Sequence, residues 1–297
     1  MAAKVLPATR ARPVARPNRV GWLIWPALLL FALFFLLPLG VLGVMAFLSG
    51  NPVNAPVHFT LRHFERFFRD DLYPEALWAT LRIGLLTTLS ALLLGYPLAH
   101  LMARAHSRIG HALLLMAVIA PMLTGIVVRT FAWMTLLQDR GVINTTLVAL
   151  GVTERPLKLM YNEFGTIVAL THIYVPFMVL TLAGVIGRVD ERLEDAARSL
   201  GATRWQAFRE VTLPLSLPGI LAGSLLVFAL SISAYVTPFL LGGTDVLTLP
   251  MLIYQQVSSS FNPNFAGALG LILLAVSLAV VIAYNKVLAG LAGEEAA

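Results

Sequence analysis

The sequence predicts an all-α, polytopic membrane protein with six transmembrane helices and short cytoplasmic helices between the fourth and the fifth. Hydrophobic residues make up 58% and charged residues 12% of the 297 residues, and the mean hydropathy is +0.82. A soluble domain is about 45–50% apolar and roughly a quarter charged. A chain this apolar needs lipid as a second solvent, and helices are the spanning form that satisfies its own backbone hydrogen bonds.

Six stretches are long enough to span, since about 20 apolar residues cross the hydrocarbon core as a helix. They are Val20–Leu48, Ala76–Ala103, Ile109–Leu137, Gly165–Val189, Leu213–Leu241 and Ala266–Val287. The first is about twice the length of a signal-peptide apolar region, so we expect an uncleaved signal anchor. We therefore divide the chain into a basic tail at residues 1–19, a six-helix membrane domain at 20–287 and a C-terminal tail at 288–297.

The basic residues predict the orientation of the chain. Of the 21 Lys and Arg residues, 13 lie at the termini and even-numbered connections, 6 lie on the opposite side and 2 lie within spans. Because Lys and Arg are retained on the cytoplasmic side, we expect both termini in the cytoplasm of a cell whose inner (plasma) membrane holds the chain. The net charge of +6 thus reflects membrane topology, and we expect lipid, not nucleic acid, as the partner of these residues.

The connection between the fourth and fifth spans, residues 190–212, predicts two short amphipathic helices. An apolar stripe recurs at i, i+3, i+4 and i+7 at Leu193, Ala196, Ala197 and Leu200. Gly201 supplies a helix stop. Thr203 and Gln206 then fit a capping box that opens a second helix, on which Trp205 and Phe208 share a face.

Physical reasoning alone leaves two interpretations of this loop open. The helices either dock on a protein partner or lie in the lipid headgroups. An interfacial helix usually has a broad, bulky apolar face and a basic polar face. This stripe is narrow and rich in alanine, and the five basic residues from Arg188 to Arg209 are balanced by five acidic residues.

At these residues the chain resembles the permease subunits of type I ATP-binding-cassette importers. Their cytoplasmic motif is Glu-Ala-Ala, three residues, Gly, nine residues, Ile, one residue, Leu-Pro. Here Asp195, Ala196 and Ala197 open it, Gly201 is its glycine, Val211 replaces the isoleucine, and Leu213 and Pro214 close it. The resemblance implies that the loop couples to an ATPase, with contact residues at Leu193, Asp195, Ala196, Ala197, Gly201, Ala202 and Trp205.

Within that superfamily the stretches Val127–Leu137, Gly141–Gly151 and Ser233–Gly243 resemble the spermidine/putrescine-type permeases. The resemblance implies import of a polyamine, opine, aminophosphonate or amino-acid derivative. It also implies three kinds of partner: ABC ATPase subunits, a second permease subunit of different sequence and an extracytoplasmic solute-binding protein. The chain has no GxxxxGK[ST] phosphate loop, so we expect a subunit that is not itself an enzyme and whose ATP hydrolysis takes place on a partner.

A gradient-coupled secondary carrier is the alternative from another functional class. Such carriers usually show internal repeats and intramembrane acidic residues, and neither is evident here. The chain has no cysteine, and its histidines lack metal-ligand spacing, so we expect no metal, cofactor or catalytic site.

Polar residues at membrane depth are the candidates for a solute pathway. Arg129 lies within the third predicted span, where it either lines the pathway or pairs with a carbonyl at a helix break. Tyr174, Tyr235 and His172 have the same two interpretations, as pathway residues or as packed, hydrogen-bonded ones. No Asp or Glu lies inside a predicted span, which argues against a polycationic solute.

Three further features have mainly structural interpretations. Arg82 lies near a span end, and we expect its side chain to reach outward. Gly219 and Gly223 form a small-xxx-small pair suited to close helix packing. The external segment Phe59–Phe68 either contacts a solute-binding protein or, as we expect, lies in the outer headgroup layer.

Overall fold

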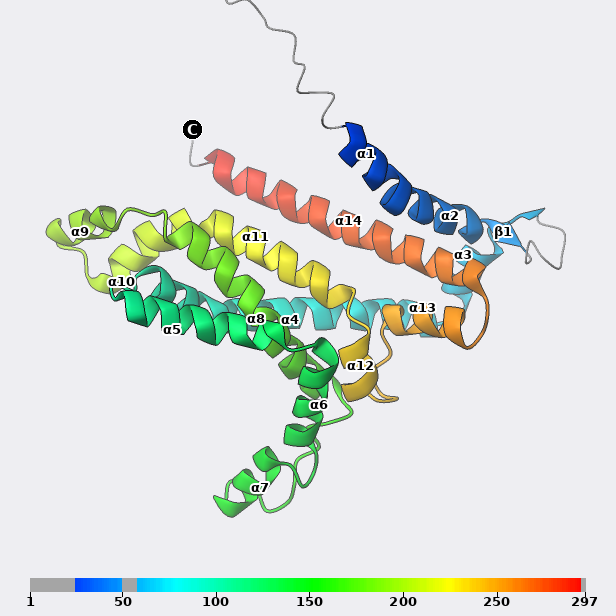
Figure 1. Cartoon of the computed structure of the whole chain (residues 1–297), viewed down its shortest axis with the longest axis horizontal. Helices are drawn as coiled ribbons and strands as arrows, with labels where there is room; N and C mark the ends of the chain where they lie inside the picture. The colour runs from blue at the N-terminus through cyan, green and yellow to red at the C-terminus, as the bar shows by residue number, and fades with distance from the viewer. Residues whose placement is uncertain (1–24, 50–57, 295–297) are drawn as a thin grey trace, which may run out of the picture. The chain divides into compact units, whose positions relative to one another are not determined.

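The computed structural model of the chain describes residues 25–49 and 58–294, with side chains up to residue 286 (Figure 1). The predicted basic tail at residues 1–19 and the start of the first span lie outside the described residues. The regular structure of the described part is helical except for one antiparallel pair, β1 (Leu48–Ser49) with β2 (His58–Phe59). The predicted all-α class is confirmed.

The chain divides into two compact units, residues 1–44 and 45–297. The first unit holds α1 (Trp25–Phe31), a π-helical turn (Ala32–Leu36) and most of α2 (Leu37–Ala46). Together these form one apolar segment of 22 residues. No side chain of α1 or of the π-helical turn is buried by protein. Lipid is the solvent that such a surface requires, and the first predicted span is thus present from Trp25 onward.

In the second unit, α4 (Leu72–Ala103), α8 (Glu163–Ile186) and α11 (Leu213–Ile232) pack together around the main hydrophobic core. The glycine pair expected on α11 allows close approach to α8. A Cβ at Gly219 would lie 2.9 Å from Cβ of Val185, and one at Gly223 would lie 2.7 Å from Sδ of Met178. A side chain at Gly219 would force α8 and α11 apart, and one at Gly223 would require Met178 to move.

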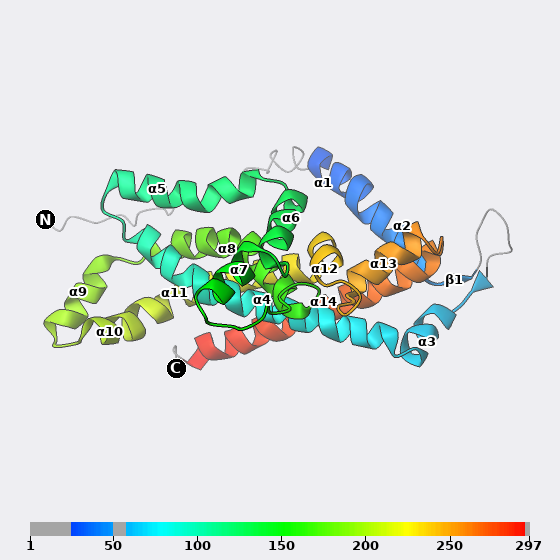
Figure 2. The same cartoon turned by 90° about the horizontal axis from the view of Figure 1, so that it is seen from below.

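A second core lies at the end of the unit that carries α3 (Arg62–Arg69). There α3 and the start of α4 pack with α13 (Leu249–Ser258) and α14 (Pro263–Glu294). Its buried side chains include Phe67, Tyr73, Leu249 and Phe265. In both views α3 lies at the opposite end of α4 from α9 and α10, the two short helices that follow α8 directly (Figures 1 and 2). The sequence did not indicate α13.

The predicted third span, Ile109–Leu137, is not one straight helix. The segment forms α5 (Arg108–Ile119) and a 3₁₀ turn (Ala120–Leu123), and then bends by 98° into α6 (Ile126–Leu137) and α7 (Val142–Ala149). Thr124 and Gly125 are extended at the bend. Residues 25–49 and 58–294 thus contain five long apolar helices, or six spans if this bent pair is one span.

The predicted fifth span is also interrupted. α11 ends at Ile232, and after a turn at residues 233–235 the chain continues as α12 (Val236–Leu241). The fourth span agrees closely with α8, and the sixth extends past the predicted end at Val287 to Glu294 as α14. Two of the pathway candidates lie at these breaks. Arg129 is in the first turn of α6, and Tyr235 directly precedes α12.

Candidate functional site

The loop after α8 folds into the two short helices that the sequence predicts, α9 (Glu191–Ser199) and α10 (Arg204–Ala207), followed by a π-helical turn (Phe208–Thr212). The side chain of Asp190 caps α9 by accepting a hydrogen bond from the backbone N–H of Arg192 at 3.0 Å. Glu191 and Glu194 lie in the first turn and Arg198 in the last. This order of charges favours the helix dipole.

Gly201 ends α9 as expected, with the two hydrogen bonds of a Schellman motif. The N–H of Gly201 donates to the carbonyl of Arg198 at 3.0 Å, and the N–H of Ala202 donates to the carbonyl of Ala197 at 3.1 Å. The φ angle of Gly201 is +99°. A side chain would strain this backbone, so the sharp turn between the two helices depends on glycine.

The predicted capping box at the start of α10 is also present. Thr203 accepts a hydrogen bond from the N–H of Gln206, and the Gln206 side chain accepts one from the N–H of Thr203 at 2.8 Å. Trp205 and Phe208 stack with ring centroids 5.4 Å apart, which confirms their shared face. Phe208 also meets the rings of Tyr96 and His100 edge-on, so α10 is anchored on α4.

The outer face of this coupling loop (residues 190–212) displays apolar side chains. Leu193 is 47%, Leu200 91% and Trp205 67% exposed. Ala196 is exposed beside them, whereas Ala197 and Ala202 are half-buried, and exposed Asp195 lies 3.8 Å from Arg198 in a loose ion pair. Exposed apolar side chains surrounded by polar residues are typical of surfaces that bind another protein.

The inner face of the loop is fixed by a cluster that the sequence analysis missed, the Glu194 cluster of Arg104, Val189, Glu194 and Thr212. Arg104 follows α4 and donates hydrogen bonds to the carboxylate of Glu194 at 2.8 Å and to the carbonyl of Val189 at 3.0 Å. Thr212 donates to the same oxygen of Glu194 at 2.5 Å. The cluster thus joins α9 to the end of α4 and to the start of α11.

Solvent reaches this cluster only in part. The side chains of Arg104 and Glu194 are 15% and 26% exposed. Burial alone would raise the pKa of Glu194, but the hydrogen bonds from Thr212 and Arg104 and the charge of Arg104 outweigh it and hold the pKa below its usual range. Glu194 therefore remains an anion that ties three elements together.

The two helix breaks meet in the protein interior. Thr130 on α6 and Thr237 on α12 are fully buried, and their hydroxyl groups lie 3.0 Å apart. Arg129 lies on the first turn of α6 and donates from Nη1 to the carbonyl of Ile173 on α8 at 3.3 Å. Its buried Nε has no hydrogen-bond partner among the described residues. The hydrogen bond to Ile173 is the pairing with a carbonyl near a helix break that one of the two interpretations describes, and a pathway role for Arg129 stays a prediction.

The remaining pathway candidates fall into different environments. Tyr174 is buried, and its hydroxyl donates to the carbonyl of Leu230 at 3.2 Å. Tyr235 is half-buried, and its ring stacks on that of Tyr254 at 4.4 Å. His172 is exposed, and its ring meets that of Trp133 edge-on in an apolar cleft of about 930 Å³ between α4, α5 and α8. The structure thus brings Arg129 and Tyr174 to one part of α8 and leaves Tyr235 at the N-cap of α12.

Two ion pairs lie at the other end of α8. Arg82 forms an ion pair with Glu163 in the first turn of α8, so its side chain reaches toward a span end as expected. Lys158 pairs with Asp245 at 3.1 Å. Within the described part of the chain, no three His, Asp or Glu side chains are grouped so that they could hold a metal ion.

Comparison with known proteins identifies the family. Residues 91–290 match the family described as binding-protein-dependent transport system inner membrane component. The spermidine/putrescine transport system permease protein PotB of Haemophilus influenzae is 32% identical over 272 residues, covering 90% of this chain and 92% of PotB. PotB of Escherichia coli is 32% identical over 266 residues, covering 89% of this chain and 93% of PotB.

Solved structures share the fold. The membrane chain of a bacterial ABC transporter involved in the import of alginate has a TM-score of 0.71 at 23% identity, covering 91% of this chain and 96% of that chain. A bacterial alginate ABC transporter in complex with its alginate pentasaccharide-bound periplasmic protein also has a TM-score of 0.71, at 20% identity, covering 90% and 92%. The gradient-coupled carrier considered above is not supported. With its coupling loop, bent spans and sequence match, the chain belongs to the family of binding-protein-dependent transport system inner membrane components, the membrane-embedded permease subunits of ABC importers.

Proposed function

We propose that this permease conducts a small organic solute inward and that separate ATPase subunits drive it by binding the coupling loop. The observation that carries the proposal is the exposed face of Leu193, Leu200 and Trp205 on a loop whose inner face is fixed to two spans. A partner that moves this face moves α4 and α11 with it. The chain holds no phosphate loop of its own, so the nucleotide chemistry belongs to the partner.

The proposed orientation places the coupling loop and both termini in the cytoplasm. The excess of Lys and Arg on that side supports it. The 32 residues of α4 span about 48 Å as a helix, so they separate α3 from the coupling loop by the full thickness of a membrane. On this orientation α3, the β1–β2 pair and the α13–α14 connection face the extracytoplasmic side.

The complete importer contains two further partners on this proposal. A second permease subunit of different sequence completes the pathway, and an extracytoplasmic binding protein delivers the solute. The family is defined by dependence on a binding protein, and a related alginate transporter was solved with its periplasmic protein bound. Both support the assignment of the partners.

The proposed pathway passes the two helix breaks. Arg129, Tyr174 and Tyr235 lie at or next to them, where backbone departs from the regular helix. Irregular backbone at membrane depth is tolerated where protein or a water-filled cavity covers it. Tyr235, half-buried and held by a ring stack, is the candidate for solute contact, and the hydrogen-bonded Tyr174 positions α8 against α11.

The proposed solute belongs to the group of polyamines, opines, aminophosphonates and amino-acid derivatives. Two relatives are named for spermidine and putrescine transport, which favours a polyamine. The positions of the acidic residues favour an opine, an aminophosphonate or an amino-acid derivative over a polyamine. In α4 and α8 the acidic residues are confined to the first turn, at Glu75 and Glu163, and Arg82 neutralises Glu163.

Uptake into sealed proteoliposomes tests the function. The complex is reconstituted with its ATPase, second permease and binding protein, and labelled putrescine, spermidine, an opine and an aminophosphonate are compared. We expect uptake of one of these classes that needs ATP and persists after an ionophore collapses the proton gradient. Uptake that needs the gradient and continues with a hydrolysis-defective ATPase would overturn the proposal.

A further inference from the structure

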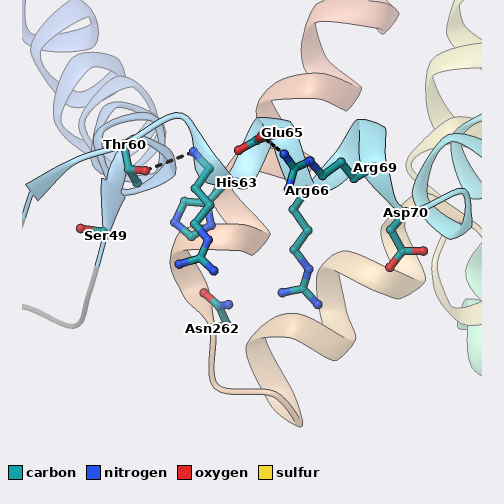
Figure 3. A pocket seen from close by; sticks show the side chains of 9 residues that line it. Ser49, Thr60, His63, Glu65, Arg66, Arg69, Asp70 and Asn262 are labelled. Carbon is teal, nitrogen blue, oxygen red and sulfur yellow. Dashed lines mark hydrogen bonds and ion pairs between the residues drawn. The ribbon is translucent and has the colours of Figure 1, made fainter.

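The end of the unit that carries α3 has a polar pocket with a concentration of arginine side chains. Its volume is about 550 Å³. Figure 3 shows Arg66 extending from α3 toward the side on which Asn262 lies, with His63 between α3 and the β1 strand. We name the side chains of Arg62, Arg66 and Arg69 the α3 arginine surface. All three are exposed and line this pocket.

Two of these arginines have no acidic partner in the part of the chain that the structure describes. Arg69 pairs with Glu65 at 2.6 Å, but no carboxylate lies within ion-pair distance of Arg62 or Arg66 among the described residues. Arg66 is nevertheless held in place, because its guanidinium lies 4.5 Å from the ring centre of Phe265 and 5.8 Å from that of Tyr73. Such cation–π contacts orient the planar donor group and leave its hydrogen bonds free for another molecule.

Two phenylalanine side chains of α3, Phe64 and Phe67, pack against other parts of the protein. Phe67 is 2% exposed and packs near Tyr73 with ring centroids 6.4 Å apart, and Phe64 meets Phe47 at 5.0 Å. Phe68 alone of the three clustered phenylalanines remains exposed. A helix that lies in the headgroup layer needs an apolar face for lipid. Phe59, Leu61 and Phe68 of the segment Phe59–Phe68 are exposed, and the expectation that the segment lies in the outer headgroups stays a prediction.

We infer that the α3 arginine surface binds carboxylate side chains on the extracytoplasmic solute-binding protein. The inference rests on the proposed orientation and on the proposed binding-protein partner. Guanidinium groups bind carboxylates through two parallel hydrogen bonds, and arginine is enriched at protein interfaces. Two unpaired guanidinium groups beside a pocket complement an acidic patch on a protein. Docking here also places the binding protein on α3 and on the α13–α14 connection, above the start of α4.

Charge reversal in the assembled importer tests the inference. The complex is placed in nanodiscs of phosphatidylcholine only, and the concentration of solute-loaded binding protein that half-maximally stimulates ATP hydrolysis is measured. We expect Arg62→Glu to raise this concentration at least about tenfold, because a repelled carboxylate loses its charge-assisted bonds. The matched control is Arg140→Glu, an external arginine in a different connection that lines another pocket, and it should leave the concentration unchanged.

The outcomes separate this inference from the proposed function. If the wild-type chain does not copurify with an ATPase, the proposed function fails. If it copurifies and responds to the binding protein, but Arg62→Glu matches wild type or Arg140→Glu has the same effect, the inference alone is overturned. An effect of Arg62→Glu that appears only in discs containing phosphatidylglycerol would assign the surface to lipid phosphate and also overturn it.

A cross-linking variant covers the case in which charge reversal disturbs folding. The chain has no cysteine, so Arg62→Cys provides a single attachment site for a benzophenone maleimide. With solute-loaded binding protein present, illumination should yield an adduct between the permease and the binding protein, and the same label at Arg140→Cys should not. Adducts with lipid alone from the Arg62 position would overturn the inference.

Discussion

Nη2 of Arg104 lies 2.8 Å from Oε1 of Glu194, across 90 positions of sequence, and Thr212 donates to the same oxygen. One carboxylate therefore joins the coupling helix α9 to the ends of α4 and α11. This oxygen links α9 to both spans, and a second ion pair, of Arg104 with Glu191 at 3.4 Å, adds to the link with α4. The hydrogen bonds of the Glu194 cluster therefore attach the coupling loop to α4 and α11.

Removing the charge at Glu194 should loosen this connection. We expect Glu194→Gln to lower solute uptake per ATP hydrolysed by about three- to tenfold, since hydrogen bonds to charged groups contribute about 1.5–3 kcal/mol and this pair is partly exposed. Uptake and hydrolysis are measured on the same proteoliposomes. Arg104→Gln should have a similar effect, and the double variant should be little worse than either single one. Arg108→Gln, an exposed arginine in the same connection, is the control. Additive losses in the double variant would show that Arg104 and Glu194 act separately.

The pH dependence of coupling should not involve Glu194 near neutrality. Its pKa is lowered in the folded protein because hydrogen bonds and the charge of Arg104 outweigh burial. A lowered pKa contributes stability above the unfolded value, and that stability is lost only as the pH falls through the folded value. The ratio of wild-type to Glu194→Gln uptake per ATP should therefore stay constant between about pH 6 and pH 8. A ratio that shrinks toward pH 6 would mean that this carboxyl titrates there and that its pKa is raised.

Substitution of Gly201 should uncouple ATP hydrolysis by the partner from solute uptake. At φ of +99° a β-branched residue is strained by about 1–2 kcal/mol, although the space for its Cβ is open. We expect Gly201→Val to insert normally and to retain ATP hydrolysis while solute uptake falls. Gly151→Val provides the matched control, because Gly151 has a φ of +69° and equally open surroundings but lies between α7 and α8. Equal loss of uptake in both variants would assign the effect to general backbone strain.

The two tyrosines at membrane depth should respond differently to mutation. Tyr235→Ala removes a half-buried ring at the second break, and we expect a higher apparent KM for solute with little change in thermal stability. Tyr174→Phe removes the hydroxyl that donates to the carbonyl of half-buried Leu230, so its main effect should be a lower Tm through loss of a hydrogen bond worth about 1 kcal/mol. Both are measured on the purified complex. An unchanged KM in Tyr235→Ala would remove this residue from the pathway.

The features that sequence analysis predicted correctly are governed by neighbouring residues. The glycine stop at Gly201 and the capping box of Thr203 and Gln206 each depend on atoms within a few positions, so the local pattern determines them. The spans around α4 and α8 follow from the length of their apolar runs. The coupling loop could therefore be placed between two spans, with its glycine turn and both of its helices, from local patterns alone.

The features that were missed depend on tertiary contacts or on bends. Hydropathy is nearly uniform from Ile109 to Leu137, so it could not reveal the 98° bend at Thr124 and Gly125. α13 has 10 residues, too few for a span search to detect. Arg104 was counted only as a basic residue for topology, because no local pattern relates it to Glu194. The packing of α3 was missed because Phe67 and Phe265, which share one buried cluster, are far apart in sequence and no local pattern relates them.

Site-specific cross-linking from the coupling loop tests the central claim most directly. Leu200→Cys gives the cysteine-free chain one thiol at its most exposed apolar position on the loop. In the intact complex, a short bifunctional cross-linker at this thiol should capture the ATPase subunit, with a yield that changes when ATP is added. Capture of lipid alone, with no ATPase adduct in either nucleotide state, would contradict the account.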